Sequence, residues 1–212
     1  MGALLVIAGC STTTEPPVTT LPSGAASAEA AVRGWLVALD GEDFDALESV
    51  VSSGSLALAV GAENSLVAAE VVAVANDERP AEVAGYWQSV AAGLSNDGFA
   101  PNELAVQEGR GLEVDGYAAV DLAIPGGAKA MTVVVRDSSE GWRVDWGGTV
   151  GPGLVRPLRS MLDGLDATAE SDQVRQLFIS AGPGLRAGLE ARSDLPPEFA
   201  ADVEELLLLL GL

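Results

Sequence analysis

The chain has 212 residues, of which 48% are hydrophobic, and 31 acidic against 11 basic side chains give it a formal net charge of −20. This acidic balance repels phosphate backbones and anionic head groups, so neither nucleic acid nor membrane adhesion by charge alone is expected. The absence of histidine and the presence of one cysteine exclude Ser-His-Asp and Cys-His hydrolases, a zinc centre built on these ligands and an intramolecular disulfide. We therefore expect a globular protein without a metal or other cofactor.

The N-terminal segment combines a short apolar run with the single cysteine. Residues 1–9 are uncharged and end in two small residues directly before Cys10. The residues that follow, up to about 26, are rich in Ser, Thr and Pro and cannot bury a core. The motif Ile7-Ala8-Gly9-Cys10 resembles the lipobox of bacterial lipoproteins, in which an aliphatic residue and two small residues precede the cysteine.

The lipoprotein resemblance implies where the protein is located. Residues 1–9 would be removed as a signal peptide, and the thiol of Cys10 would receive a diacylglycerol group. Palmitate and related acyl chains would then hold the protein on the outer face of the cytoplasmic membrane, with residues 10–26 as a tether. The family's signals begin with Lys or Arg, and neither precedes Cys10 here. Either the natural start lies upstream of Met1, or the cysteine is incidental.

Helical periodicity predicts a group of helices after the tether. Ser27 is expected to cap a helix that ends at about Asp40, and a shorter helix is expected over 43–51. The following apolar stretch is poorly patterned, and we predict a helix only from about 64 to 75. A further helix is expected from about 80 to 95.

From residue 102 the apolar period changes from helical spacing to two. Alternation up to Ile124, over 128–136 and over 142–146 predicts an antiparallel meander of about four strands, with one face buried and one face in solvent. Gly- and Ser-rich turns separate these segments.

The remainder of the chain is predicted to be helical. Residues 147–153 are expected to close the sheet region as a glycine-rich loop, and 182–184 are expected to break the chain as a second loop. Helices are predicted over about 154–165, 171–181 and 196–210. The last of these helices either plugs the mouth of the sheet or covers an outer surface.

The predicted order of elements resembles that of the NTF2-like, or cystatin-like α+β, superfamily. In both, helices come first and a curved meander follows, which here ends in Gly141-Trp142-Arg143-Val144-Asp145-Trp146. The resemblance is strongest over 31–44 and 133–145 and covers roughly residues 27–150. It implies an α+β cone, in which N-terminal helices pack on a curved antiparallel sheet, and it leaves residues 151–212 as a helical extension.

The NTF2-like resemblance also implies a possible chemistry. Ketosteroid isomerases and polyketide cyclases of this superfamily use an inward-facing carboxylate in the cone for acid–base catalysis. The sheet carboxylates Asp115, Asp121 and Asp145, and the hydroxyl group of Tyr117, all alternate opposite to the apolar positions. We therefore expect them to face solvent. A bulge at Gly116 is the alternative that would turn part of this strand inward.

Tryptophans and arginines supply the remaining candidate site residues. The apolar stripes carry four tryptophans: Trp35, Trp87, Trp142 and Trp146. We expect these rings in the core, and the alternative is the wall of a pocket for an apolar ligand such as a lipid tail. Arg136 and Arg143 are expected on the solvent face of the last hairpin, where they pair with Asp145 or Glu140 or meet an acidic partner.

The leading hypothesis is a non-enzymatic lipoprotein whose NTF2-like domain is a binding or scaffolding module of the cell envelope. The alternative is a carrier of small apolar ligands, or an enzyme like the ketosteroid isomerases and polyketide cyclases. The expected partners are the membrane through Cys10, an envelope protein or apolar small molecule, and a second copy through the solvent face of the sheet. The arginine bias, with Lys129 as the single lysine, is similar to that of proteins from high-GC actinobacteria.

Overall fold

The computed structural model describes residues 24–96, 99–192 and 195–212. The predictions for Cys10, for the lipobox and for most of the tether lie outside these residues. The first half of the described chain contains α1 (Ala28–Asp40), α2 (Phe44–Val50), α3 (Ser53–Asn64), α4 (Ala68–Ala75), α5 (Pro80–Asn96) and the 3₁₀ turn η1 (Pro101–Glu103). The second half contains β1 (Ala105–Val106), β2 (Arg110–Gly111), β3 (Tyr117–Ala123), β4 (Lys129–Ser138), β5 (Gly141–Val144), α6 (Trp146–Asp163), α7 (Ala169–Ala191) and α8 (Pro197–Leu209).

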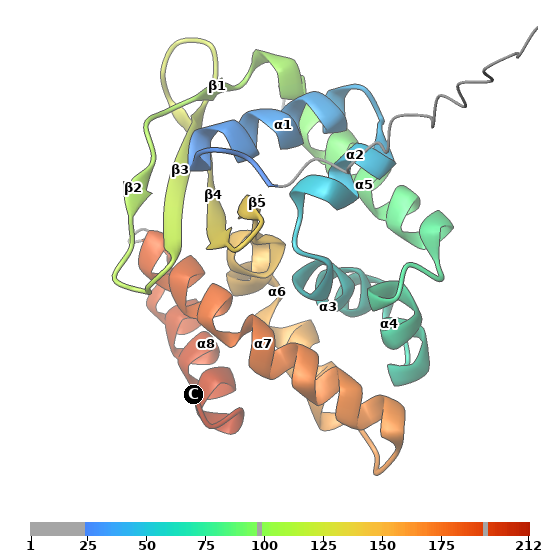
Figure 1. Cartoon of the computed structure of the whole chain (residues 1–212). Coiled ribbons are helices and arrows are strands. Elements are labelled where there is room, and N and C mark those ends of the chain that lie inside the picture. Colours follow the sequence, from blue (N-terminus) through green and yellow to red (C-terminus); the bar gives the residue numbers. More distant parts are fainter. Residues whose placement is uncertain (1–23, 97–98, 193–194) are drawn as a thin grey trace, which may run out of the picture.

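The predicted fold class is confirmed: N-terminal helices pack on a curled antiparallel sheet, and further helices follow it (Figure 1). The long β3–β4 hairpin is the centre of the sheet. The short strands β1 and β2 both pair with the outer edge of β3, and β5 pairs with β4. The other edge of β5 is covered by single bridges from Ala25 to Trp142 and from Val51 to Val144. An edge covered in this way offers little backbone for pairing with another chain.

The concave face of the sheet packs against α1. Ser27 caps this helix as predicted, because its side chain accepts a hydrogen bond from the backbone N–H of Ala30. The helix then presents its apolar stripe to the strands. The main core contains the stripe residues Val32, Trp35, Leu36 and Leu39 together with Val120, Val133, Val135 and Val144 of the sheet.

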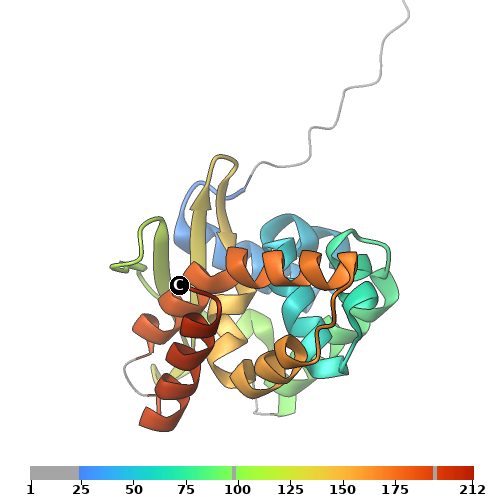
Figure 2. The same ribbon diagram turned by 90° about the horizontal axis from the view of Figure 1, so that it is seen from below.

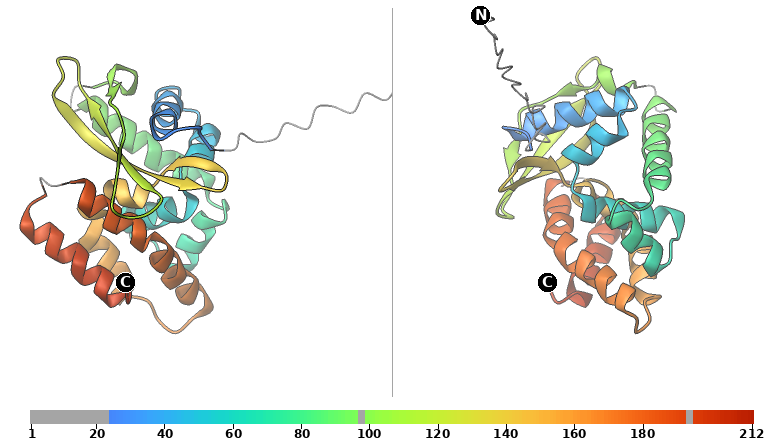
Figure 3. Two further views of the ribbon diagram at one scale, coloured as in Figure 1. Left: turned by 60° about the vertical axis from the view of Figure 1, so that its left-hand side comes forward. Right: turned by 45° about the vertical axis from the view of Figure 1, so that its right-hand side comes forward.

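The opposite face of the sheet is not in solvent, contrary to the prediction. The alternation itself is correct, since Tyr117 and Ala119 of β3 share a face with Val134 of β4. These side chains are nevertheless buried, in a second cluster with Ala187 and Ala191 of α7. Figures 2 and 3 show α7 lying across the sheet, with α8 beside it. A period of two distinguishes the two faces of a strand, but it does not show whether a distant helix covers the second face.

The predicted loops at 147–153 and 182–184 are also wrong, because both segments lie inside helices. α6 begins at Trp146 and contains Pro152 and Pro157, and α7 runs through Pro183. Helical glycine costs about 1 kcal/mol relative to alanine, and an internal proline costs more. Close packing between the two helices offsets this cost.

The glycines of α6 and α7 allow that close approach. A Cβ atom on Gly148 would lie 2.6 Å from the backbone oxygen of Gly184, and one on Gly188 would overlap the backbone oxygen of Gly148. Pro152 lacks the N–H that would normally bond to this oxygen four residues earlier in the helix. The carbonyl group of Gly148 is therefore free to face α7.

The prediction missed α3. We expected one helix from about 64 to 75, whereas the chain forms α3, turns at Ser65 with a left-handed backbone (φ 53°), and forms α4. All eight residues from Ser55 to Ala62 are buried. A helix buried on all sides has no polar stripe, so helical periodicity does not reveal it.

Substitution of Gly148 by alanine tests the contact between α6 and α7. We expect Gly148→Ala to lower the free energy of unfolding by about 1–3 kcal/mol, because the added methyl group meets backbone and the side chain of Val134, which cannot move aside cheaply. Gly153→Ala in the same helix is the matched control, since its Cβ meets no atom within 4 Å. The control should be neutral or gain up to about 1 kcal/mol. Urea unfolding measures both, and equal effects would contradict the proposed contact.

Candidate functional site

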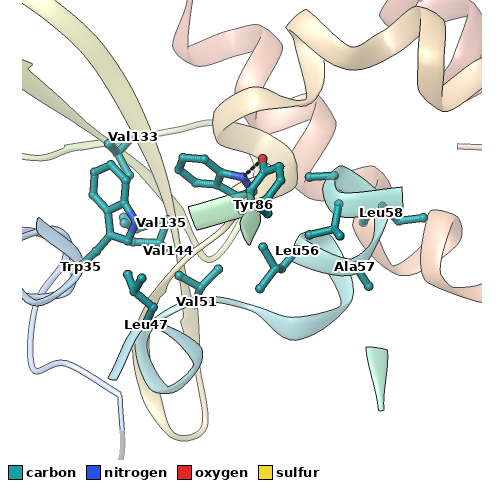
Figure 4. Packing of buried hydrophobic residues seen from close by; sticks show 14 of the residues in the cluster. Trp35, Leu47, Val51, Leu56, Ala57, Leu58, Tyr86, Val133, Val135 and Val144 are labelled. Carbon is teal, nitrogen blue, oxygen red and sulfur yellow. Dashed lines mark hydrogen bonds between the residues drawn. The ribbon is translucent and has the colours of Figure 1, made fainter. Parts of the chain in front are cut away.

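Aromatic side chains fill the concave interior. Trp35 of α1, Trp87 of α5 and Trp146 of α6 are at most 2% exposed. The ring of Trp146 lies 5.5 Å from that of Trp35 and 4.9 Å from that of Trp87, centre to centre. Its Nε1–H donates a hydrogen bond to the hydroxyl group of Tyr86, which Figure 4 marks as a dashed line. These rings occupy the space that a ligand would need on the concave side of the sheet.

The fourth tryptophan lies apart from this cluster. Trp142 is half-buried on β5, where its backbone exchanges two hydrogen bonds of 2.9 Å with Ala25. Four tryptophans were considered as a pocket wall. Three of them pack together in the interior, and the fourth lies where the tether meets the domain.

Two of the predicted sheet carboxylates are accessible. Asp115 is exposed in the turn before β3. Asp121 is half-buried, accepts a hydrogen bond from the hydroxyl group of Thr132 and forms ion pairs with Arg110 at 3.3 Å and Lys129 at 3.8 Å. Ion pairs this exposed are worth little stability, so Asp121 is an ordinary surface carboxylate.

The prediction that Asp145 faces solvent is wrong. Its side chain is on the predicted side of the sheet, but the residue is only 2% exposed. Asp145 follows β5 directly and caps α6, with Oδ1 accepting a hydrogen bond of 2.8 Å from the N–H of Gly148. Aspartate is a common N-cap, which accepts a hydrogen bond from an N–H group in the first turn of a helix. The sequence analysis missed this cap because it predicted a loop over 147–153.

The surroundings of Asp145 come from three elements. The hydroxyl group of Tyr117 on β3 lies 3.4 Å from its Oδ2 atom, and α7 passes so close that a Cβ on Gly184 would lie 2.6 Å from the same oxygen. Burial raises the pKa of the Asp145 carboxyl, and the N–H of Gly148 and the charge of Arg136 only partly oppose this effect. Burial and the nearby carboxylate likewise raise the pKa of Tyr117. The side chain of Asp145 thus contacts β3, α6 and α7.

Arg136 and Arg143 are directly opposite each other on β4 and β5. Arg143 pairs with Glu140, one of its two predicted partners. Arg136 is exposed and forms no ion pair within the described part of the chain. Its charge acts on Tyr117 and Asp145.

Two surface hollows meet at Arg136. The Tyr117 hollow has a volume of about 310 Å³ and is lined by Asp115, Gly116, Tyr117, Arg136, Asp137, Ser180 and Pro183. The Ser–Arg hollow has a volume of about 260 Å³ and is lined by Ser52, Ser53, Arg136, Ser138, Ser139, Glu140 and Arg143. Asp145 lines neither hollow, so its carboxyl group does not reach a ligand there.

Sequence reasoning did not find a third hollow, which we call the α4–α6 groove. It has a volume of about 660 Å³ and lies between the turn from α3 to α4 and the turn from α6 to α7. Its apolar lining includes Leu66, Val67, Met161 and Leu165, and its polar lining includes Asp166 and Thr168. Because α3 was not predicted, no sequence signal placed these two turns together.

Within residues 24–96, 99–192 and 195–212, no group of three or more carboxylate, thiol or imidazole side chains is arranged to hold a metal ion. None of the helices in these ranges has both the length and the apolar character needed to cross a membrane. Comparison with protein-family models, with curated proteins and with solved structures finds no match to this chain.

The buried carboxyl group makes stability depend on pH in a specific direction. Because the pKa of Asp145 is raised, the folded protein binds its proton more tightly than the unfolded chain, and this residue's contribution to stability falls as pH rises from about 4 through the folded pKa. An asparagine at this position would be an equally good cap without a charge to bury, so Asp145→Asn should match or exceed the wild type at pH 7. The difference should shrink towards pH 4.

Urea unfolding of both proteins between pH 4 and pH 8 measures this difference. Asp145→Ala is the control, because it removes the cap and should cost about 0.5–2 kcal/mol. If Asp145→Asn were as unstable as Asp145→Ala at pH 7, the buried charge would be stabilising and our account of this residue would be wrong.

Proposed function

We propose that this chain is a lipoprotein of the bacterial cell envelope, held at the outer face of the cytoplasmic membrane through Cys10. The observation that carries the proposal is the motif Ile7-Ala8-Gly9-Cys10 followed directly by a Ser-, Thr- and Pro-rich tether. Acyl chains contribute roughly 0.8 kcal/mol per buried methylene, so two or more chains on one cysteine suffice for stable anchoring. The net charge of −20 offers no comparable attraction to an anionic membrane.

We further propose that the folded domain is a non-enzymatic binding or scaffolding module, related in design to the NTF2-like superfamily. Support comes from the order of the elements, with helices before a curled meander whose concave side faces α1. Support also comes from the filled interior, because an isomerase or a carrier of apolar ligands needs space where Trp35, Trp87 and Trp146 pack together. The buried carboxyl group of Asp145 caps α6 and lies against Tyr117 and α7, away from the tryptophan cluster.

Binding would then take place on the outer surface. The α4–α6 groove offers a mixed apolar and polar lining for a segment of an envelope protein. Of the two hollows at Arg136, the Ser–Arg hollow has a positively charged lining, whereas Asp115 and Asp137 outweigh Arg136 in the Tyr117 hollow. The face of the sheet that we considered for pairing with a second copy is occupied by α7. A scaffolding role therefore requires other surfaces than this one.

Replacement of the anchoring thiol tests the proposed location. Cys10→Ala should move the protein from the membrane fraction to the soluble fraction, because the acyl chains have no other attachment point. Fractionation of the producing cells, followed by detection of the protein in each fraction, measures the shift. Ser11→Ala is the matched control and should stay with the membrane. A Cys10→Ala protein that remains in the membrane fraction would contradict the proposal.

A further inference from the structure

The Ser–Arg hollow concentrates positive charge and hydroxyl groups in a protein with few cations. Two of the 11 basic residues, Arg136 and Arg143, line it from directly opposite positions on β4 and β5. Like charges in opposite positions of a sheet repel each other, and Glu140 pairs only with Arg143. An anion between the two guanidinium groups would remove this repulsion.

The hydrogen-bonding groups of the hollow are incompletely used. The Nε–H of Arg143 has no hydrogen-bond partner in the described part of the chain, but it is buried and reaches a ligand only if the side chain moves. Ser138 donates its hydroxyl to the backbone oxygen of Gly141. The hydroxyl groups of Ser52, Ser53 and Ser139 form no hydrogen bond within the described residues. Guanidinium groups and hydroxyls around one small space are the donors that a phosphate group requires.

The first turn of α3 forms the wall opposite the hairpin. The N–H of Ser52 donates a hydrogen bond of 3.0 Å to the backbone oxygen of Val144, which ties this turn to β5. The side chain of Ser52 does not cap the helix, so the first N–H groups of α3 are not bonded to it. The positive end of the helix dipole therefore adds to the field of the two arginines.

The hollow also lies close to the point where the tether enters the folded domain. Gly24 packs on the β4–β5 turn, and Ala25 exchanges two backbone hydrogen bonds with Trp142. Figure 2 shows the start of the described chain beside the β4–β5 hairpin. From Cys10 to Gly24 the chain has 14 residue steps (24 − 10), which span at most roughly 50 Å when fully extended. An anchored domain thus reaches the head groups of its own membrane, and such tethering raises their effective concentration to about the millimolar range.

We propose that the Ser–Arg hollow is a binding site for a phosphate ester, held between Arg136 and Arg143 and by the serine hydroxyls. A phospholipid head group is one source of this chemistry and a soluble phosphate is the other; the first rests on the proposed anchor at Cys10. The overall charge of −20 repels anions at a distance, but salt screens this repulsion beyond about 8 Å. The charged side chains that line the hollow are Arg136, Arg143 and Glu140, so the lining carries a net positive charge.

Titration of the full chain carrying Cys10→Ala tests the site without depending on the anchor. Inorganic phosphate and dihexanoyl phosphatidylglycerol below its micelle threshold are the two probes, and amide chemical shifts of the four serines that line the hollow are the readout. We expect saturable shifts with at least one probe. Tighter binding of the lipid identifies the head group as the source, and tighter binding of phosphate identifies a soluble ester; either result supports the site.

The arginine pair provides the first matched comparison. Arg136→Gln with Arg143→Gln should weaken binding at least tenfold. Arg33→Gln with Arg186→Gln removes the same charge from exposed helix positions and should leave binding within twofold. Shifts that do not saturate with either probe, or an equal loss in both double variants, would overturn the proposal.

Glu140→Gln provides a test in the opposite direction. The carboxylate of Glu140 is 62% exposed and competes with an anion for Arg143. Its removal should tighten binding by threefold or more without disturbing the fold. Unchanged or weaker binding would show that the anion does not use Arg143.

Discussion

The close approach of α6 and α7 is the constraint on which the rest of the structure depends. Glycines at the crossing, among them Gly148 and Gly188, let the two backbones touch, and Pro152 leaves a carbonyl group available to face the second helix. Asp145 lies at the same crossing, where it caps α6 beneath α7 and reaches Tyr117 on the sheet. Because α7 is held there, the second face of the sheet is buried. The C-terminal helices are therefore part of the core of the fold and not an appendage to it.

Because of this packing, the candidate binding features lie on the surface of the molecule. One face of the sheet holds the tryptophan cluster, and the other is covered by small residues of α7. The candidate binding features lie where elements meet at the outside: the α4–α6 groove and the two hollows at Arg136. The tether joins the domain at the hairpin that carries Arg136 and Arg143, so an anchor and a phosphate site on this hairpin would act on the same membrane surface.

Much of the fold could be predicted from the sequence, because several elements bury only one face. The stripe of α1 and its cap at Ser27 mark a helix with one buried side. The alternation of β3 and β4 assigned residues to the two faces of the sheet correctly, although both faces are buried. The missed elements lack a contrast between a polar side and an apolar side. α3 is buried on all sides, and α6 and α7 contain glycine and proline residues whose intrinsic preference is outweighed by their contact with each other.

The candidate site was also only partly predictable, because local sequence patterns do not reveal contacts between distant elements. Alternation placed Tyr117 and Asp145 on the correct side of the sheet, but only the position of α7 shows that this side is buried. The pairing of Arg143 with Glu140 could be predicted, since it is local to one turn. The Ser–Arg hollow could not, because it requires the first turn of α3 to lie against β5, and that contact is set by packing between distant parts of the chain.

The central functional claim concerns Cys10, and the mature N-terminus tests it most directly. Mass spectrometry of the N-terminal peptide, isolated from the membranes of cells that produce the protein naturally, reports both the cleavage site and the modification. We predict a peptide that begins at Cys10 and carries the mass of a diacylglycerol group. A peptide that contains residues 7–12 with an unmodified cysteine would contradict this claim.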